Sequence, residues 1–405
     1  MKKGNATSDT DMTLTPESQR LHIVLAGNRN SGKSSMLNAI AGQQAAIVSD
    51  TPGTTTDRVS KPMEIIGLGP CVLIDTAGFD DCGELGLKRV QASADALKTA
   101  DIVLIVLDAS EGVIPEIAGV TSSSNAPNRV PVLPVINKAD LCDSERLDAF
   151  AAEVEKKFGV KAVVASALKH IGIRELIQTI RESIPEDWDA PLLTADLLEE
   201  GDLALLVMPQ DRQAPKGRLI LPQQQTIREL LDRKCRVVCC DADTLQATLG
   251  TLNEPPKAII ADSQVMDKVQ KLKPEGTVLT SFSILLAAAK GDIEYFKESA
   301  KTIDSLTPHS RVLIAEACTH VPVSEDIGRV QIPRLLRSKA GQGLSVEVVS
   351  GRDFPEDLRG YDLVIHCGAC MFNRRYVLSR VQQAKAQGIP MTNYGITIAY
   401  IKNLL

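Results

Sequence analysis

Continuous apolar runs of strand length alternate with amphipathic stretches in the first half of the chain. Five such runs occur before residue 185, namely LHIVLA (21–26), CVLID (71–75), DIVLIVLDA (101–109), PVLPVIN (131–137) and KAVVAS (161–166). Runs without polar alternation are typical of strands buried on both faces. With helices between them, they predict a parallel sheet that is covered on both sides.

The rest of the chain repeats this rhythm on a smaller scale. One block has apolar runs at 203–208, 236–240, 258–260 and 277–281, with an amphipathic helix expected over 225–234; the last block has runs at 311–317, 345–350, 362–367 and near Pro390. The segment around Pro185 and Pro191 indicates a domain boundary. We therefore expect two smaller parallel α/β domains after the first. The expected segments are a flexible tail (1–20), a first domain (21–185), a second (190–275) and a third (276–405).

Composition narrows the class of protein without changing this picture. The 405 residues are 44% apolar and 24% charged, with a net charge of −6. This is the composition of a soluble globular protein, and the acidic balance argues against a nucleic-acid-binding role. No apolar run reaches the roughly 18 residues of a membrane span, and the N-terminus lacks the features of a signal peptide. We expect a cytoplasmic protein without nucleic-acid or membrane partners.

The first apolar run is followed by a phosphate-binding motif. GNRNSGKS (27–34) matches G-x-x-x-x-G-K-[ST] and lies between a predicted strand and a helix expected over 33–41. Its glycines let backbone N–H groups turn toward phosphate oxygens at the helix N-terminus. Lys33 can bridge the β- and γ-phosphates, and Ser34 can ligate Mg²⁺. The expected nucleotide contacts here are Asn28, Asn30, Ser31, Gly32, Lys33, Ser34 and Ser35.

Three further motifs follow at the carboxyl ends of later strands or in the loops there, where open α/β sheets bind ligands. In DTAG (75–78), Asp75 can hold Mg²⁺ through water and Gly78 can donate its N–H to the γ-phosphate. In NKAD (137–140), Asn137 and Asp140 have the side chains needed to read the guanine edge, with Lys138 packed beside it. In SAL (166–168), Ser166 and Ala167 lie where the Ala167 amide can meet the guanine oxygen. Together the motifs predict a P-loop, Ras-like GTPase domain that binds GTP and Mg²⁺.

Residues 20–185 resemble the TrmE/Era-type branch of the translation-factor GTPases, which also carry a TPGTT run such as TPGTTTD (51–57). The resemblance implies that Thr55 is the switch ligand to Mg²⁺. It also implies K⁺ dependence, because the K⁺-requiring members have Asn at the position of Asn30. Lys33, Asn30, Thr55 and Gly78 are thus the expected catalytic groups. Phe79 follows DTAG where Ras-like proteins have the water-positioning Gln, so intrinsic GTP hydrolysis should be slow; Glu84 is a weak candidate for the missing group.

Nine cysteines in a chain without an export signal argue against a disulfide framework. Six of them, namely Cys71, Cys82, Cys142, Cys235, Cys239 and Cys240, are expected to be packed thiols. The others form Cys318-Thr-His320 and His366-Cys367-Gly-Ala-Cys370, each just beyond a predicted strand. Parallel strands would bring the two motifs to one sheet edge. The donors suit a [4Fe–4S] cluster, a structural zinc site, a thioredoxin-like redox pair or plain packing.

From about residue 20 to 405, the combination of this GTPase domain with C-x-H and H-C-x-x-C resembles the HydF family of [FeFe]-hydrogenase maturation GTPases. The resemblance implies a homodimer formed through the middle domain. It also implies a [4Fe–4S] cluster on Cys318, Cys367 and Cys370, with His320 and His366 as candidates for the fourth ligand or for an outer role. Such a protein would take a transient di-iron subcluster precursor from the radical-SAM maturases HydE and HydG and deliver it to apo-[FeFe]-hydrogenase. The rival interpretations are an RNA-directed GTPase, for tRNA modification or ribosome assembly, and a GTP-regulated module with a structural zinc domain.

Overall fold

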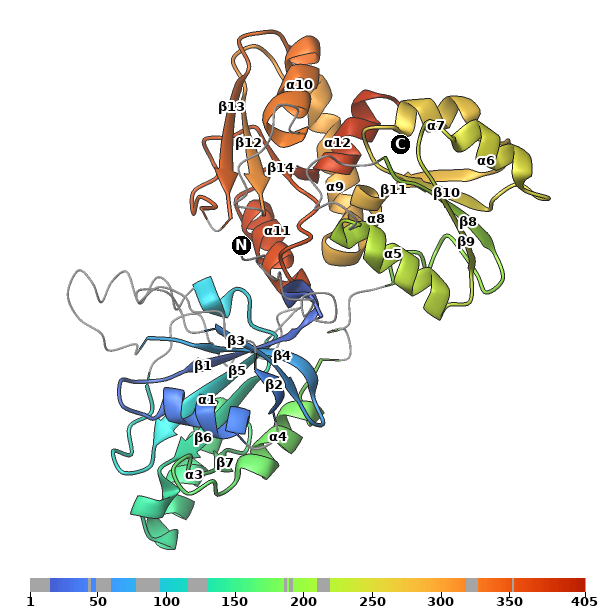
Figure 1. Cartoon of the computed structure of the whole chain (residues 1–405). Helices are drawn as coiled ribbons and strands as arrows, with labels where there is room; N and C mark the ends of the chain where they lie inside the picture. Colours follow the sequence, from blue (N-terminus) through green and yellow to red (C-terminus); the bar gives the residue numbers. More distant parts are fainter. Residues whose placement is uncertain are drawn as a thin grey trace, which may run out of the picture. The chain divides into compact units, whose positions relative to one another are not determined.

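The computed structural model describes residues 15–42, 45–48, 60–77, 95–115, 130–185, 188, 192–209, 219–317, 327–351 and 353–404. The chain forms two compact units, Met1–Asp189 and Ala190–Leu405. Figure 1 shows the elements of both, and each unit is described here by itself.

The first unit is built around a seven-stranded sheet of order β2-β3-β4-β1-β5-β6-β7. Its strands are β1 (Leu21–Ala26), β2 (Ala45–Val48), β3 (Ser60–Ile65), β4 (Gly69–Asp75), β5 (Ile102–Asp108), β6 (Val132–Asn137) and β7 (Val163–Val164), and its longer helices are α1 (Lys33–Gly42), α3 (Ser144–Phe158) and α4 (Ile173–Glu182). All five predicted strands are present, and β1 lies between β4 and β5, parallel to both. The motifs that follow these strands therefore lie at one edge of the sheet.

The sheet is not purely parallel as expected. β3 pairs antiparallel with β4, and β2 pairs antiparallel with β3. The sequence of β3, SKPMEI, carries polar residues and a proline. Only Met63 and Ile65 of this strand are buried, so β3 lacks the continuous apolar run by which the other strands were predicted.

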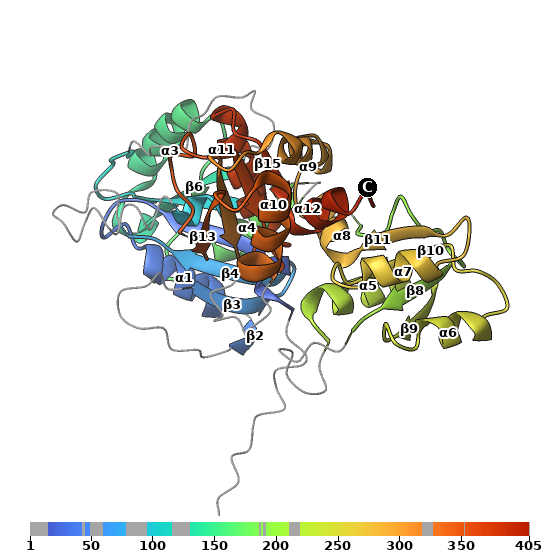
Figure 2. The same cartoon turned by 90° about the horizontal axis from the view of Figure 1, so that it is seen from above.

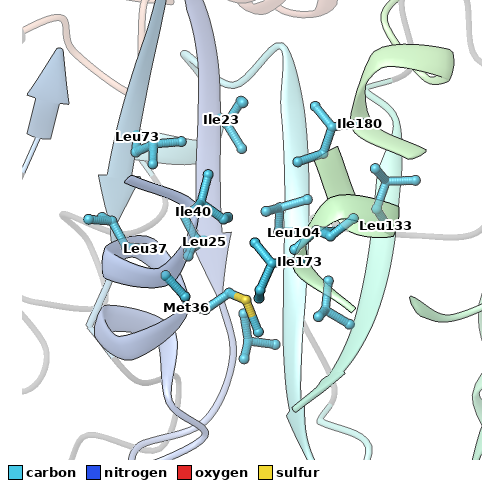
Figure 3. Packing of buried hydrophobic residues seen from close by; sticks show 14 of the residues in the cluster. Ile23, Leu25, Met36, Leu37, Ile40, Leu73, Leu104, Leu133, Ile173 and Ile180 are labelled. Atoms are coloured by element: carbon cyan, nitrogen blue, oxygen red, sulfur yellow. The ribbon is translucent and has the colours of Figure 1, made fainter. Parts of the chain in front are cut away.

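The two faces of the first sheet are covered by different helices. Side chains of β1 alternate between them: Ile23 and Leu25 face one core, and Val24 faces the other. In Figure 3, Met36, Leu37 and Ile40 of α1 and Ile173 and Ile180 of α4 pack on the first of these cores. Phe150 and Val154 of α3 pack on the second. This double cover explains why the strands contain so few polar residues.

The second unit holds two four-stranded sheets, both entirely parallel, as the predicted fold class requires. The first has the order β11-β10-β8-β9 and comprises β8 (Leu203–Val207), β9 (Arg236–Cys240), β10 (Ala258–Ala261) and β11 (Val278–Ser281), with α5 (Leu221–Asp232), α6 (Leu245–Thr251), α7 (Met266–Leu272) and α8 (Phe282–Lys290). The second has the order β13-β12-β14-β15 and comprises β12 (Arg311–Glu316), β13 (Ser345–Ser350), β14 (Leu363–His366) and β15 (Met391–Asn393), with α9 (Ile293–Ala300), α10 (Ile332–Ala340), α11 (Arg374–Ala386) and α12 (Tyr394–Ile401).

Helix α8 leads from one of these sheets to the other. It starts directly after β11, where the Ser281 side chain accepts a hydrogen bond from the Ile284 amide and caps the helix. Because β11 pairs with β10, residues 278–281 belong to the sheet of the second domain, although they follow the expected boundary at 275/276. Farther along, α8 packs beside α12, as Figures 1 and 2 both show.

The last residues of the expected N-terminal tail are part of the folded unit. Glu17–Gln19 form a 3₁₀ turn, and Arg20 is buried. The Arg20 guanidinium donates to the Met63 carbonyl at 3.2 Å, which ties this segment to β3. Among the described residues, no helix is both long and apolar enough to span a bilayer.

Candidate functional site

The phosphate-binding loop has the backbone that its motif requires. Lys33 is buried, and its Nζ donates to the carbonyls of Gly27 at 3.1 Å and Asn28 at 2.7 Å. The Lys33 side chain thus folds over the loop and places its ammonium where phosphate oxygens would bind. Asn30 has φ = +62° and is exposed, so the loop alternates in handedness, which turns successive N–H groups inward.

Two glycines allow this loop to pass close to its neighbours. Gly27 has φ = +151°, and a Cβ there would lie 2.3 Å from the Val106 carbonyl oxygen. Gly32 has φ = +90°, and a Cβ there would lie 2.2 Å from Nδ2 of Asn137. Any side chain at either position would push the loop away from the sheet.

Ser34 and Asp75, two of the residues expected to bind Mg²⁺ directly or through water, contact each other. The Ser34 hydroxyl donates a hydrogen bond to Oδ2 of Asp75. Burial raises the pKa of the Asp75 carboxyl, and the Ser34 hydrogen bond and the nearby Lys33 charge offset only part of this effect. Oδ1 of Asp75 is buried without a hydrogen-bond partner in the described part of the chain. A buried, unsatisfied carboxylate oxygen beside a hydroxyl fits a hard cation such as Mg²⁺.

The predicted guanine-binding residues also lie together. Asn137 is buried; its Nδ2 donates to the Ser31 carbonyl at 2.9 Å, and its Oδ1 accepts from the Ala167 amide at 3.0 Å. The Ser166 hydroxyl donates to Oδ1 of Asp140 at 2.5 Å. One network therefore joins three of the predicted motifs and leaves the exposed Asp140 carboxylate at the surface.

Asp108 at the end of β5 is a residue of this site that sequence reasoning missed. Lys138 has φ = +61°, and its Nζ donates to Oδ2 of Asp108 at 2.5 Å. Burial alone would raise the pKa of Asp108, but hydrogen bonds from Lys138 and Ser110 outweigh it and lower that pKa. The pairing of Asp108 with Asn137 across β5 and β6 is the structural signal for this contact. Asp108 therefore orients Lys138, the residue expected beside the guanine.

Several predicted residues lie outside the described part of the chain. They are Thr55, Gly78, Phe79 and Glu84 in the nucleotide site, Cys318 and His320 in the cysteine–histidine site, and Cys82, one of the expected packed thiols. Within the described residues, no group of three or more His, Cys, Asp or Glu side chains is arranged to hold a metal ion.

Cys367 lies directly after β14, next to the end of β12. Its Sγ accepts hydrogen bonds from the backbone amides of Ala317 at 3.0 Å and Ala369 at 3.4 Å. Burial raises the pKa of the Cys367 thiol to about 11, although both amides act in the opposite direction. Two amides directed at one sulfur fit a thiolate whose charge is shared with a metal. Cys318 follows Ala317 in the sequence but lies outside the described residues.

Both ring nitrogens of His366 are engaged inside the protein. Nε2 lies 2.9 Å from Nη1 of Arg380, and Nδ1 lies 2.9 Å from the Cys367 carbonyl. Since a guanidinium only donates, Nε2 is the acceptor and Nδ1 carries the proton. Burial and the Arg380 charge lower the pKa of His366 to about 3. This arrangement favours an orienting role over direct ligation.

Two buried cations beside this site could not be inferred from spacing. Arg380 of α11 lies over the rings of Phe354, Phe372 and Tyr376, with its guanidinium carbon 4.6–4.8 Å from each centroid. Lys290, the last residue of α8, donates to the carbonyls of Ala369 at 3.0 Å, Cys370 at 3.4 Å and Phe372 at 2.7 Å. Hydrogen bonds from Lys290 therefore fix the loop from Cys367 to Phe372 against α8.

Comparison with known families agrees with this division of the chain. Residues 22–138 match the model of the 50S ribosome-binding GTPase. Residues 193–291 match the hydrogen maturase F dimerization domain, and residues 294–405 match the hydrogen maturase F tetramerization domain. The last two matches together cover just over half of the chain.

Similar curated proteins are GTPases that match less than half of this chain. The tRNA modification GTPase MnmE of Nitrosomonas europaea is 45% identical over 125 residues, which are 30% of this chain and 26% of that protein. GTPase Era of Thermosipho melanesiensis is 36% identical over 167 residues, which are 40% of this chain and 55% of that protein. The chain thus spans only about a quarter to a half of the length of these two relatives.

Solved structures give weaker likenesses. A single-residue variant of Era from Aquifex aeolicus, bound to GDP·AlF4⁻, is 22% identical, with a TM-score of 0.34 over 62% of this chain and 97% of that one. The G domain of the FeoB iron transporter of T. maritima is 22% identical, with a TM-score of 0.28; the match covers 41% of this chain and 99% of that chain. These scores add nothing to the assignment, which depends on the family models. The chain carries a GTPase domain followed by both assembly domains of hydrogen maturase F, and it belongs to that family.

Proposed function

We propose that this protein is a GTP-hydrolysing iron–sulfur scaffold that assembles or delivers the di-iron subcluster precursor of [FeFe]-hydrogenase. The observation that carries the proposal is the environment of Cys367, whose Sγ accepts two backbone N–H groups at the sheet edge shared by β12 and β14. Backbone donors stabilise a thiolate and tune the potential of a cluster bound to it. A packed structural thiol would not require them.

The donor set favours an iron–sulfur cluster over zinc. Cys318, Cys367 and Cys370 are the proposed ligands, and three thiolates leave one iron of a [4Fe–4S] cluster without a protein thiolate. Such an open iron is what a scaffold needs in order to accept and release a second iron unit. A structural zinc site would normally be closed by four protein ligands. The hydrogen bonds of His366 support an outer role for its imidazole, and His320 remains a candidate for the fourth position.

The first unit would supply the GTP hydrolysis. Lys33 is proposed to bind the β- and γ-phosphates, and Ser34 and Asp75 to hold Mg²⁺ with Thr55. Gly78 is proposed to contact the γ-phosphate through its amide, and Asn30 to help bind a K⁺ ion that offsets developing charge there. The unsatisfied Oδ1 of Asp75 supports the Mg²⁺ assignment. Turnover without a partner should be slow, because Phe79 stands where related enzymes position water.

The proposal also includes an assembly and a set of partners. The match to a dimerization domain supports a homodimer formed through residues 193–291, and the match to a tetramerization domain supports a larger assembly. The proposed partners are HydE and HydG, which would load the di-iron precursor, and apo-[FeFe]-hydrogenase, which would receive it. The precursor is cargo in this scheme, whereas the [4Fe–4S] cluster is resident.

A transfer assay tests this proposal. Protein produced with HydE and HydG is purified anaerobically and mixed with apo-[FeFe]-hydrogenase, and hydrogen evolution is measured. We expect activation by the wild type and by Cys142→Ala, and none by Cys367→Ala or Cys370→Ala. A Lys33→Ala arm then reports whether GTP hydrolysis is coupled to loading or to delivery. Activation by the Cys367→Ala variant would contradict the scaffold role.

An RNA-directed GTPase is the competing function, because MnmE is a tRNA modification GTPase. The alignment with MnmE covers only 30% of this chain. The assembly domains that follow support hydrogenase maturation instead. Stoichiometric RNA in the purified protein, without iron or sulfide, would favour the competitor.

A further inference from the structure

Lys290 is a lysine enclosed within the protein beside the proposed cluster ligands. Its side chain is 5% exposed, and its Nζ donates to the carbonyls of Ala369, Cys370 and Phe372. These carbonyls belong to the loop that carries both cysteines of H-C-x-x-C. The Lys290 ammonium therefore binds three carbonyl oxygens of this loop and links the loop to α8.

Among the residues that the structure describes, no carboxylate pairs with the Lys290 ammonium, whose hydrogen bonds go to three backbone carbonyls. Burial lowers the pKa of its ammonium to about 8, and the nearby Cys370 and Cys367 act in the opposite direction. A buried lysine without a carboxylate is costly unless another anion compensates it. The groups placed to do so are the sulfurs of the same loop, once they are thiolates.

The lysine comes from a different domain than the loop it holds. Helix α8 lies in the segment that matches the dimerization domain, whereas the loop lies in the segment that matches the tetramerization domain. A second contact in the same place joins them, because Nε of Arg374 donates to the Ala289 carbonyl at 3.2 Å. Leu286, Lys290 and Cys367 also line one small internal pocket. Helix α8 thus packs against the loop that carries Cys367 and Cys370.

We propose that Lys290 is a positioning residue for the iron–sulfur cluster: it holds the Cys367–Phe372 loop in its ligating conformation and places a buried positive charge behind the cluster. Only the effect of the Lys290 charge on the cluster rests on the proposed function, because the contact between Lys290 and the loop exists without a cluster. A nearby cation stabilises the reduced, more negatively charged state of a cluster. The loss of Lys290 should therefore make the reduction potential more negative.

Two variants separate the hydrogen bonds from the charge. Lys290→Gln keeps N–H donors near the carbonyls but is neutral, whereas Lys290→Met removes both the donors and the charge. Lys297→Met is the matched control, because Lys297 is on the next helix, is half-exposed and pairs with Glu294 on the surface. All experiments use the full chain, and Lys290→Gln remains informative if Lys290→Met does not fold.

The first measurement is amide hydrogen exchange of the apo protein over residues 367–373. The Phe372 amide donates to the Ala369 carbonyl at 3.1 Å, so the held loop should be protected. We expect faster exchange in Lys290→Met, a smaller increase in Lys290→Gln and none in Lys297→Met. Unchanged exchange in both Lys290 variants would overturn the positioning role, whether or not the protein binds a cluster.

The second measurement is an EPR-monitored redox titration of the reconstituted protein. The cluster bound by either Lys290 variant should show a more negative midpoint potential than the wild-type cluster, whereas the potential of Lys297→Met should not shift. An unshifted potential in both Lys290 variants would overturn the charge effect and leave the scaffold function standing. If the wild type binds no iron and sulfide, the proposed function fails. Hydrogen exchange then still tests whether Lys290 holds the Cys367–Phe372 loop in place.

Discussion

Asn137 and Ser31, which are 106 positions apart in the sequence, are joined by a hydrogen bond of 2.9 Å from the Asn137 side-chain amide to the Ser31 carbonyl. The oxygen of the same amide accepts from the Ala167 backbone at 3.0 Å. One buried side chain thus connects the phosphate-binding loop to both guanine-binding motifs. The motifs predicted to bind phosphate and guanine are therefore joined by hydrogen bonds through Asn137.

Replacing Asn137 should therefore destabilise the first unit even without nucleotide. Asn137→Ala leaves a buried carbonyl and a buried amide without partners, each at a cost of about 1–3 kcal/mol in the free energy of unfolding. We expect this unit to unfold at a lower urea concentration. Asn38→Ala is the control, because it removes only an exposed hydrogen bond from Lys61 and should change the transition little. An unchanged transition in Asn137→Ala would mean that the network is not formed in solution.

Guanine selectivity should depend on Asp140. Its exposed carboxylate can accept two hydrogen bonds from the N–H groups of guanine, whereas an asparagine there offers one acceptor and one donor. Asp140→Asn should weaken GTP binding by roughly 10- to 100-fold, at about 1.5–3 kcal/mol for a hydrogen bond to a charged group. Xanthosine triphosphate has an oxygen in place of the guanine amino group, so its affinity should fall less than that of GTP when Asp140 is replaced by Asn. Equal losses for both nucleotides, measured by fluorescence competition, would argue against this contact.

The Asp108–Lys138 pair predicts a specific dependence of stability on pH. The pKa of Asp108 is lowered in the folded protein, because hydrogen bonds from Lys138 and Ser110 outweigh the effect of burial. A lowered folded-state pKa gives stabilisation that is complete above the unfolded value of about 3.9 and is lost as the pH falls through the folded value. Asp108→Asn should thus be less stable than the wild type near neutral pH, and the difference should shrink below about pH 4. A difference that stays constant from neutral to acidic pH would contradict the ion pair.

The proposed role of Asn30 predicts dependence on a monovalent cation. With K⁺ exchanged for Na⁺ at constant ionic strength, kcat for GTP hydrolysis should fall by on the order of ten-fold, because a cation at the γ-phosphate stabilises developing charge. In Asn30→Ala, the two salts should give similar low rates. If the wild type hydrolyses GTP equally fast in both, the role given to Asn30 is wrong.

Much of this molecule could be predicted because its strands are buried on both faces. Leu21–Ala26 is an example: His22 is its one polar residue, and all six residues are buried, so the nearly continuous apolar run predicts a strand. Strand β3 was missed because three of its six residues are Ser, Lys and Glu and a fourth is proline. Local pattern carries little information about such an edge region.

The nucleotide motifs could be predicted because each depends on a contiguous stretch of chain. Asp108 could not, since a carboxylate at the end of an apolar strand looks the same whether it faces solvent or Lys138. Lys290 could not either, because it is 80 positions from Cys370 and meets the loop only through tertiary packing. Contacts between distant segments depend on how helices such as α8 pack, and no spacing rule encodes that.

Removing single cysteines should separate ligands from packed thiols. Cys367→Ala and Cys370→Ala should abolish the visible absorbance of a bound cluster, because each removes one of three thiolates. Cys235→Ala, in the core of the second domain, should keep it. Absorbance that survives in both Cys367→Ala and Cys370→Ala would place the cluster elsewhere.

The most direct test of the scaffold proposal is metal and sulfide analysis of the wild-type protein, purified and reconstituted without oxygen. The proposal predicts about four irons and about four acid-labile sulfides per chain, as a single [4Fe–4S] cluster requires. Stoichiometric zinc with no sulfide in the same preparation would contradict it.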